Sequence, residues 1–264
     1  MVTDFATKGW AVFGRDPAVL GWLGHAGPAA IGVMQGAGAP PAGFDCEGTW
    51  FVGVDALPND ATGAVNGSGP LTGRAVAFLR AYMGGALPPL HRAQVSALFP
   101  GYPRPRTGEG DAAFRYRQRR DAAHVDGLLP VGPERHRMIR EPHAFVLGLP
   151  VTACDDRASP LVVWEGSHRI MGAAFRQALE PYPPRDWPDV DLTGAYHAAR
   201  AQVFRRCRRV RLVARPGGAY ALHRHALHGI AAWQDGAEAP PEGRVIIYFR
   251  PECPGGIRGW LDPD

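Results

Sequence analysis

From residue 93 onwards, most of the sequence consists of short runs in which apolar residues alternate with polar or basic ones, separated by glycine and proline. Side chains alternate between the two faces of a strand, so such runs predict β-strands. The breaks between them predict turns. The chain is therefore constrained to a sheet-based fold. Strands are expected at residues 93–99, 113–126, 141–154, 159–164, 208–215, 219–225 and 244–250, with earlier ones at 10–13 and 49–54.

Helical patterns lie mainly before this region. Asp16 and Pro17 form a favourable N-cap and first-turn pair, and a second helix is expected over 70–83. We predict a mainly β fold with flanking helices, a jelly roll. The whole of 1–264 is expected to form a single domain, with an N-terminal helical flank over about 1–88 and a jelly-roll core over about 90–252 that carries a helical insert at 169–207.

Two shorter segments also carry predictions. The break at 155–158 is short and polar, which indicates a hairpin between the strands on either side. Residues 36–69 are rich in glycine, proline and asparagine and are expected to be irregular surface.

The composition excludes several classes of protein. Lys8 is the only lysine, so the formal charge of +4 is carried by arginine, and no nucleic-acid-binding motif accompanies it. No apolar run is long enough to span a membrane. We therefore expect neither a nucleic acid nor a membrane as partner. Scattered cysteines and the absence of a secretory signal predict a cytoplasmic protein. The basic run at 115–120 is interpreted as a solvated strand face, with attraction for an anionic substrate as the alternative.

One imidazole and one carboxylate stand two residues apart, at His124 and Asp126. On a strand, residues at this spacing point to the same face. An iron site of the facial-triad kind requires this pair, a second histidine, and open positions for other ligands. An isolated His-x-Asp is more often a local hydrogen-bonded pair than a metal site, so a third ligand is needed to support a metal site here.

Three histidines, His223, His225 and His228, offer that third ligand. A zinc-binding helix could use His225 and His228, and a cupin-type site could use His223 and His225. His228 is placed best, because Arg244 opens the last strand after it and shares one face with Ile246 and Tyr248. An arginine that points into a closed barrel is costly to bury unpaired, so it implies an anion inside.

The ordered segments resemble the phytanoyl-CoA dioxygenase-like family of iron(II)/2-oxoglutarate-dependent oxygenases. The resemblance implies a cupin-like double-stranded β-helix in which His124, Asp126 and His228 bind iron and Arg244 holds the distal carboxylate of 2-oxoglutarate. It extends from about residue 94 to 250 and rests on HVD at 124–126, WEGSHR at 164–169, PGGAYALHRHALHG at 216–229 and GRVIIYFR at 243–250.

The sequence departs from the family pattern at three places. Glu165 replaces the usual proline of the Gly-Ser-His turn, and residues 234–243 form an insert before Arg244. Ile230 stands two residues after His228, where a serine or threonine often assists the co-substrate. Gln94, a polar residue in an otherwise apolar strand, is the candidate replacement contact.

The resemblance implies a dioxygenase that uses iron(II), 2-oxoglutarate and O2 to hydroxylate a small-molecule substrate, releasing succinate and CO2. Asp126 favours hydroxylation, because halogenases of the family carry a small residue there. Two alternatives stay open: a cupin-type metal-binding isomerase, and a metal-binding barrel without catalysis. The substrate could be an amino acid, a natural-product scaffold or a small anionic metabolite. Segments 36–69 and 169–207 are expected to shape the mouth of its pocket.

Overall fold

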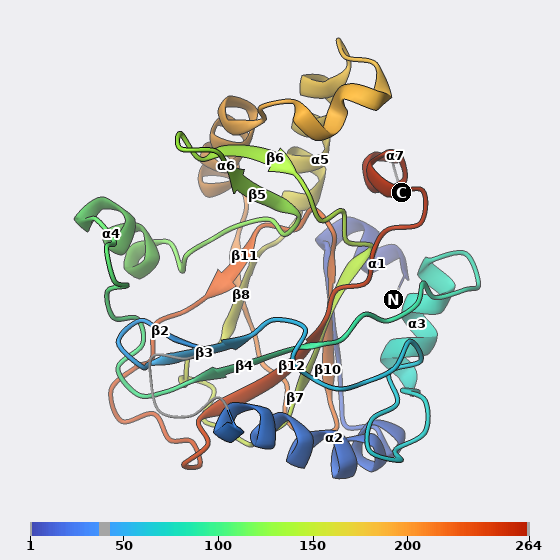
Figure 1. Cartoon of the computed structure of the whole chain (residues 1–264), viewed down its shortest axis with the longest axis vertical. Coiled ribbons are helices and arrows are strands. Elements are labelled where there is room, and N and C mark those ends of the chain that lie inside the picture. The colour runs from blue at the N-terminus through green and yellow to red at the C-terminus, as the bar shows by residue number, and fades with distance from the viewer. Residues whose placement is uncertain (1, 37–42, 263–264) are drawn as a thin grey trace.

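The computed structural model describes residues 2–36 and 43–262, and two antiparallel sheets form its centre (Figure 1). The larger sheet has seven strands in the order β1-β10-β7-β12-β4-β3-β2, and the smaller has three in the order β11-β8-β9. A separate ribbon pairs β5 with β6. The strands are β1 Trp10–Phe13, β2 Phe44–Asp45, β3 Trp50–Gly53, β4 Gln94–Leu98, β5 Leu128–Val131, β6 His136–Ile139, β7 Phe145–Pro150, β8 Leu161–Trp164, β9 Arg209–Leu212, β10 Ala219–His223, β11 His228–Ile230 and β12 Arg244–Phe249.

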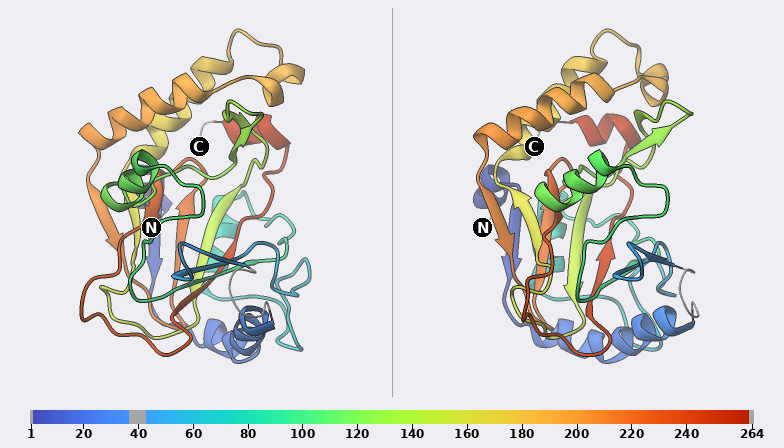
Figure 2. Two further views of the ribbon diagram at one scale, coloured as in Figure 1. Left: turned by 60° about the vertical axis from the view of Figure 1, so that its left-hand side comes forward. Right: turned by 90° about the vertical axis from the view of Figure 1, so that its left-hand side faces the viewer.

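Helices cover the outer face of the larger sheet and one end of the molecule (Figures 1 and 2). Trp22 of α2 packs against Phe249, with ring centroids 5.9 Å apart, and Phe78 of α3 packs against Phe13 at 5.4 Å. Burial of these large rings against the sheet fixes the two helices in place. The helices are α1 Val2–Lys8, α2 Pro17–Gly36, α3 Arg74–Tyr82, α4 Asp111–Arg119, α5 Ser167–Leu179, α6 Thr193–Arg206 and α7 Gly256–Leu261, with a 3-10 helix at Pro184–Asp189.

Strand β12 shows how the sequence separates the two cores. Val245, Ile247 and Phe249 belong to the outer core beneath the helices, whereas Ile246 and Tyr248 belong to a second core between the two sheets. This is the alternation predicted from the sequence, because successive side chains of a strand point to opposite faces. The predicted jelly-roll arrangement of two sheets with flanking helices is confirmed, and the insert predicted at 169–207 corresponds to α5, the 3-10 helix and α6.

The strand predicted at residues 113–126 is wrong. Its first part is helix α4, and the remainder is a loop of turns in which His124 makes an isolated bridge. The alternation of basic and aromatic residues in this segment is typical of a strand, but Tyr116 and Arg120, four residues apart, both contact α6 as residues on one side of a helix do. The guanidinium group of Arg120 lies 4.6 Å from the ring of Phe204 in α6, and that of Arg200 lies 4.6 Å from the ring of Tyr116.

The hairpin predicted at 155–158 is also wrong. Residues 155–158 do turn, with the Asp155 carboxylate accepting the backbone N–H of Arg157. However, β7 belongs to the larger sheet and β8 to the smaller one, so the segment carries the chain from one sheet to the other. Both strands are buried along their whole length, which two opposed sheets satisfy better than one half-exposed hairpin.

The N-terminal flank contains more than helices, since β1, β2 and β3 all join the larger sheet. The helix expected at 70–83 begins later, at Arg74. Of the region 36–69, residues 37–42 lie outside the described part, and β2 and β3 lie within the remainder. Helices α1 and α7 and the β5–β6 ribbon were not expected from the sequence. None of the helices described has the length and apolar character required to cross a bilayer.

Candidate metal centre

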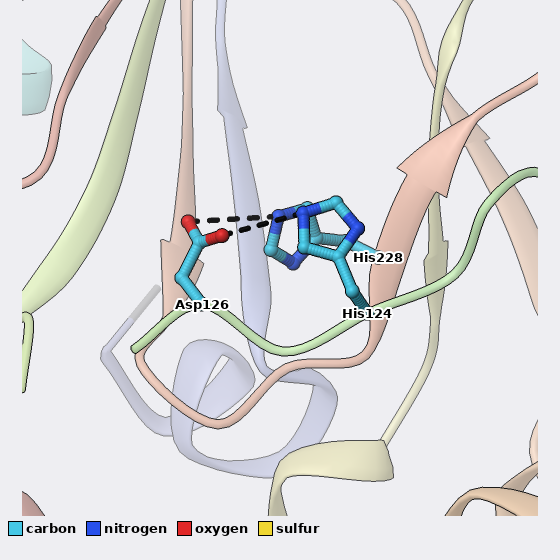
Figure 3. Close-up of side chains that lie close together, drawn as sticks. All are labelled: His124, Asp126 and His228. Atoms are coloured by element: carbon cyan, nitrogen blue, oxygen red, sulfur yellow. Dashed lines mark ion pairs between the residues drawn. The ribbon is translucent and has the colours of Figure 1, made fainter. Parts of the chain in front are cut away.

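Two segments that are far apart in sequence bring three side chains together between the two sheets (Figure 3). His124, Asp126 and His228 each offer one ligand atom, and the three atoms lie within 4.8 Å of one another. The Nε2 atom of His124 is 3.3 Å from one carboxylate oxygen of Asp126, and Nε2 of His228 is 3.8 Å from the other. The structure therefore brings together the three residues that the sequence singled out.

The ligand loop, residues 120–127, does not need to be a strand to present this pair. The backbones of His124 and His228 exchange two hydrogen bonds of 2.8 and 3.0 Å, which align the loop with β11. Asp121 anchors the loop further, because its carboxylate accepts bonds of 2.7 and 2.8 Å from the Arg209 guanidinium on β9. A Cβ atom at position 229 would collide with the carbonyl oxygen of Asp121, so this close approach requires Gly229.

Both imidazole rings are held with the same nitrogen facing the site. The Nδ1 atom of His124 lies 3.0 Å from the carbonyl oxygen of Ala122, and Nδ1 of His228 lies 2.9 Å from that of Ala226. A carbonyl oxygen can only accept, so Nδ1 donates in each ring, and in the neutral ring Nε2 carries the lone pair that binds a metal. This is the arrangement in which a second partner orients a metal-binding histidine.

The protonation states of Asp126 and His228 favour a bound cation. Burial raises the pKa of Asp126, but His228, His124 and Arg250 outweigh it, and the pKa lies well below its ordinary value. Burial lowers the pKa of His228 to about 4, despite the opposing effect of Asp126. At neutral pH the site therefore presents a carboxylate and a neutral imidazole at His228. Two imidazole nitrogens and one carboxylate fit iron(II) with positions left open.

An inner cavity of about 220 Å³ adjoins the ligands between the sheets. Its wall is mainly apolar, and it includes Gln94, Tyr248 and Arg250 beside the three ligands. Gln94, which the sequence suggested as a co-substrate contact, thus lies in the same cavity as the ligand triad. Its side-chain oxygen accepts a bond of 2.8 Å from Arg250.

Arg244 is buried between the sheets but does not line the inner cavity. Its side chain borders a neighbouring space of about 30 Å³ and donates a 3.2 Å hydrogen bond to the hydroxyl of Tyr220. Only 8% of Arg244 is exposed, and no carboxylate among the described residues lies within 4 Å of its guanidinium. The expected inward cation is therefore present, without an anion from the described protein to neutralise it.

Sequence reasoning missed Arg250. One of its terminal nitrogens lies 3.8 Å from Asp126, and the other is the donor to Gln94. The signal was present, because residue 250 has the same strand parity as Arg244, Ile246 and Tyr248. Its side chain lies just beyond the end of β12 and borders the ligand triad from the side of the larger sheet.

An outer cleft of about 610 Å³ also borders the triad. It is formed by α4, residues 122–130, the β5–β6 ribbon and α6. His124 borders both spaces, and half of its side chain is exposed. The candidate centre therefore lies between a narrow inner cavity and a wider outer cleft.

The other histidines do not join the centre. His223 and His225 are buried and contact aromatic residues, with His225 packing edge-on to Trp260 at 4.2 Å between ring centroids. His168 packs against His223 at 4.6 Å. In the described part of the chain, the triad is the only group of three residues suited to hold a metal. The alternative pairs that use His223 or His225 are not assembled as ligands.

The chain matches no protein-family model and no curated protein. Solved structures do resemble it. The non-heme alpha-ketoglutarate-dependent carbocyclase SnoK from nogalamycin biosynthesis aligns with a TM-score of 0.50 and 15% identity, covering 99% of this chain and 90% of SnoK. The epimerase SnoN aligns with a TM-score of 0.48 and 14% identity, covering 95% of this chain and 79% of SnoN. EctD from S. alaskensis, solved with 2-oxoglutarate and 5-hydroxyectoine, aligns with a TM-score of 0.46 and 15% identity, covering 95% of this chain and 74% of EctD. The likeness to SnoK establishes that the chain has the fold of that enzyme.

Proposed function

We propose that the protein is an iron(II)/2-oxoglutarate-dependent dioxygenase of the phytanoyl-CoA dioxygenase-like kind, which hydroxylates a small molecule. The observation that carries this proposal is the convergence of His124, Asp126 and His228, with ligand atoms within 4.8 Å, beside a cavity between two sheets. The fold shared with SnoK, which is described as alpha-ketoglutarate dependent, supports it. Iron bound there would supply the chemistry by which O2 oxidises 2-oxoglutarate to succinate and CO2 and hydroxylates the substrate.

The residues around the triad have distinct roles in this proposal. His124 and His228 present Nε2, and Asp126 presents a carboxylate that is ionised at neutral pH. Asp126 would occupy a metal position that could otherwise admit another anion, which favours hydroxylation. The apolar wall of the inner cavity would exclude water from the reaction.

Arg244 and Gln94 would hold the co-substrate. The uncompensated cation of Arg244 is suited to the distal carboxylate of 2-oxoglutarate, because a buried guanidinium gains most from a charge-assisted pair. Reaching it requires the inner cavity to extend past Tyr248, which shares the strand face with Arg244. Gln94 lies in the cavity wall and would contact the co-substrate end nearer the metal.

The test is succinate formation. Purified protein supplied with iron(II), 2-oxoglutarate and O2 is expected to release succinate slowly even without a substrate, and Asp126→Ala is expected to release none. Asp111→Ala, which removes an exposed carboxylate from the first turn of α4, is the control and should match the wild type. Equal succinate formation by wild type and Asp126→Ala would refute the assignment.

We also propose a cytoplasmic location, since the scattered cysteines indicate a reducing compartment.

A further inference from the structure

The outer cleft carries more positive than negative charge. Its acidic residues are Glu109, Asp126 and Glu141. A concave surface lined by one sign of charge attracts ligands of the other sign. The basic residues of the cleft are Arg106, Arg117, Arg135, Arg137, Arg200 and Arg250.

Half of these arginines are already neutralised. Arg106 forms an ion pair with Asp45, Arg117 forms a buried one with Glu109, and Arg250 lies beside Asp126. The others are Arg135, Arg137 and Arg200. Across residues 2–36 and 43–262, no carboxylate lies within 4 Å of their guanidinium groups. The excess charge of the cleft is thus concentrated on the side formed by the β5–β6 ribbon and α6.

Arg137 and Arg200 are held against the same aromatic ring. The guanidinium of Arg137, on β6, lies 5.8 Å from the centroid of Tyr196, and that of Arg200 lies 5.0 Å from it. Arg200 also stacks on Tyr116. Stacking fixes the plane of a guanidinium while its N–H edge stays available for a carboxylate or phosphate. The cleft therefore holds two oriented cations close together.

These two side chains have few other partners. One terminal nitrogen of Arg137 donates to the backbone oxygen of Leu128 at 3.3 Å, and within the described residues the side chain of Arg200 makes no hydrogen bond. Burial together with Arg200 and Arg137 lowers the pKa of His197, as expected in a positively charged cleft. Tyr116 connects this region to the ligand loop, because its hydroxyl donates a 2.7 Å bond to the backbone oxygen of Ala123, next to His124.

We propose that the outer cleft binds a small-molecule substrate bearing a carboxylate or phosphate group, and that Arg137 and Arg200 hold this group while the rest of the substrate reaches the exposed side of His124. This inference rests on the proposed function, which places the reaction at the triad. The anion site differs from that of Arg244, which lies between the sheets and does not line the outer cleft.

The experiment compares three probes that share one ring: phenyl phosphate, benzoate and benzyl alcohol. Each is titrated calorimetrically, without O2, into protein loaded with iron(II) and 2-oxoglutarate. Variants are Arg137→Gln, Arg200→Gln, the double variant and Arg200→Lys. The control is Arg205→Gln, which makes the same charge change on an exposed position of α6 outside the cleft.

We expect the anionic probes to bind and benzyl alcohol to bind at least about tenfold more weakly, because a charge-assisted pair contributes more than ring contact alone. Arg137→Gln and Arg200→Gln should each weaken anion binding about tenfold. The affinity of Arg200→Lys for the anions should lie between the affinities of the glutamine variants and the wild type, since lysine lacks the planar fork. The affinity of Arg205→Gln for the anions should stay within about twofold of that of the wild type. Whichever anion binds more tightly identifies the substrate group.

Equal binding of benzyl alcohol and the anions, or equal losses in Arg200→Gln and Arg205→Gln, would overturn the inference. Displacement of 2-oxoglutarate by phenyl phosphate, seen as loss of the visible absorption of the iron complex, would also overturn it. Failure of the proposed function has another signature: that absorption would not form at all, while the arginine-dependent binding of phenyl phosphate would persist in metal-free protein.

Discussion

Arg244 is a buried cation that donates a hydrogen bond to the hydroxyl of Tyr220 and has no carboxylate of the described residues within 4 Å. If it holds 2-oxoglutarate, Arg244→Met should weaken 2-oxoglutarate binding about 10- to 100-fold, the loss of a charge-assisted bond of about 1.5–3 kcal/mol. Because methionine removes an unpaired buried charge, the melting temperature of the ligand-free protein should not fall.

Titration calorimetry and thermal unfolding measure the two effects, with exposed Arg258→Met as the control. Unchanged 2-oxoglutarate affinity together with a lower melting temperature would assign Arg244 a structural role instead.

At the scale of single residues, the sequence indicated His124 and Asp126 by their spacing, and His228 and Arg244 only through the ordered motifs of the family resemblance. It did not identify Arg250, because that assignment requires knowing which end of β12 faces the triad. The cleft formed by Arg137 and Arg200 was equally hidden, since β6 and α6 are distant in sequence and the ribbon itself was not predicted. The basic run at 115–120 contributes Arg117 to this cleft, already paired with Glu109.

Asp16 joins two helices and provides a prediction at the scale of elements. One of its carboxylate oxygens accepts the backbone N–H of Ala18 in the first turn of α2, and the other accepts that of Arg74 at the start of α3. Asp16→Ala removes both acceptors and should lower the free energy of unfolding by about 1–3 kcal/mol. Urea unfolding measures it, with exposed Asp235→Ala on a surface turn as a comparison. Equal losses in the two variants would contradict this role.

The same residue gives a pH dependence. The backbone N–H groups of Arg74 and Ala18 lower the pKa of Asp16 below its ordinary value of 3.8. A carboxylate with a lowered pKa stabilises the fold above the unfolded pKa, and this contribution is lost as the pH falls through the folded pKa. The stability difference between wild type and Asp16→Ala should therefore be full at neutral pH and should narrow on acidification below 3.8. A difference that stays constant with pH would exclude ionisation as its source.

The elements that sequence reasoning placed correctly have strong local signals. Strand β12 follows Gly243 and is a short run, RVIIYF, rich in β-branched and aromatic residues, and Asp16 precedes Pro17, the first residue of α2. Helix α4 was not predicted, because its sequence alternates basic residues and has no apolar stripe. Its contacts with α6 are aromatic and cationic, and a local sequence pattern does not reveal them. The hairpin predicted between β7 and β8 was wrong because a short polar break predicts a turn but does not show which sheet the chain enters next.

At the scale of the molecule, the two-sheet architecture followed from the number and spacing of the strands, and the side chains of the triad meet because β11 and the ligand loop lie side by side.

A ligand that binds only the folded state raises its stability by RT ln(1 + [L]/Kd), about 2.7 kcal/mol at a concentration of 100 Kd. Zinc, as a redox-inert substitute, should therefore raise the melting temperature, and 2-oxoglutarate should raise it further only when metal is present. In Asp126→Ala both increments should disappear; their persistence would place the metal elsewhere.

The central claim is that His124, Asp126 and His228 hold an iron(II) ion that also binds 2-oxoglutarate. The most direct measurement is visible absorption of the protein under anaerobic conditions, as iron(II) and then 2-oxoglutarate are added. Chelation of iron by 2-oxoglutarate is expected to produce a charge-transfer band in the wild type and none in His228→Ala. A wild type that binds both components without developing the band, or a His228→Ala variant that develops it fully, would contradict the account.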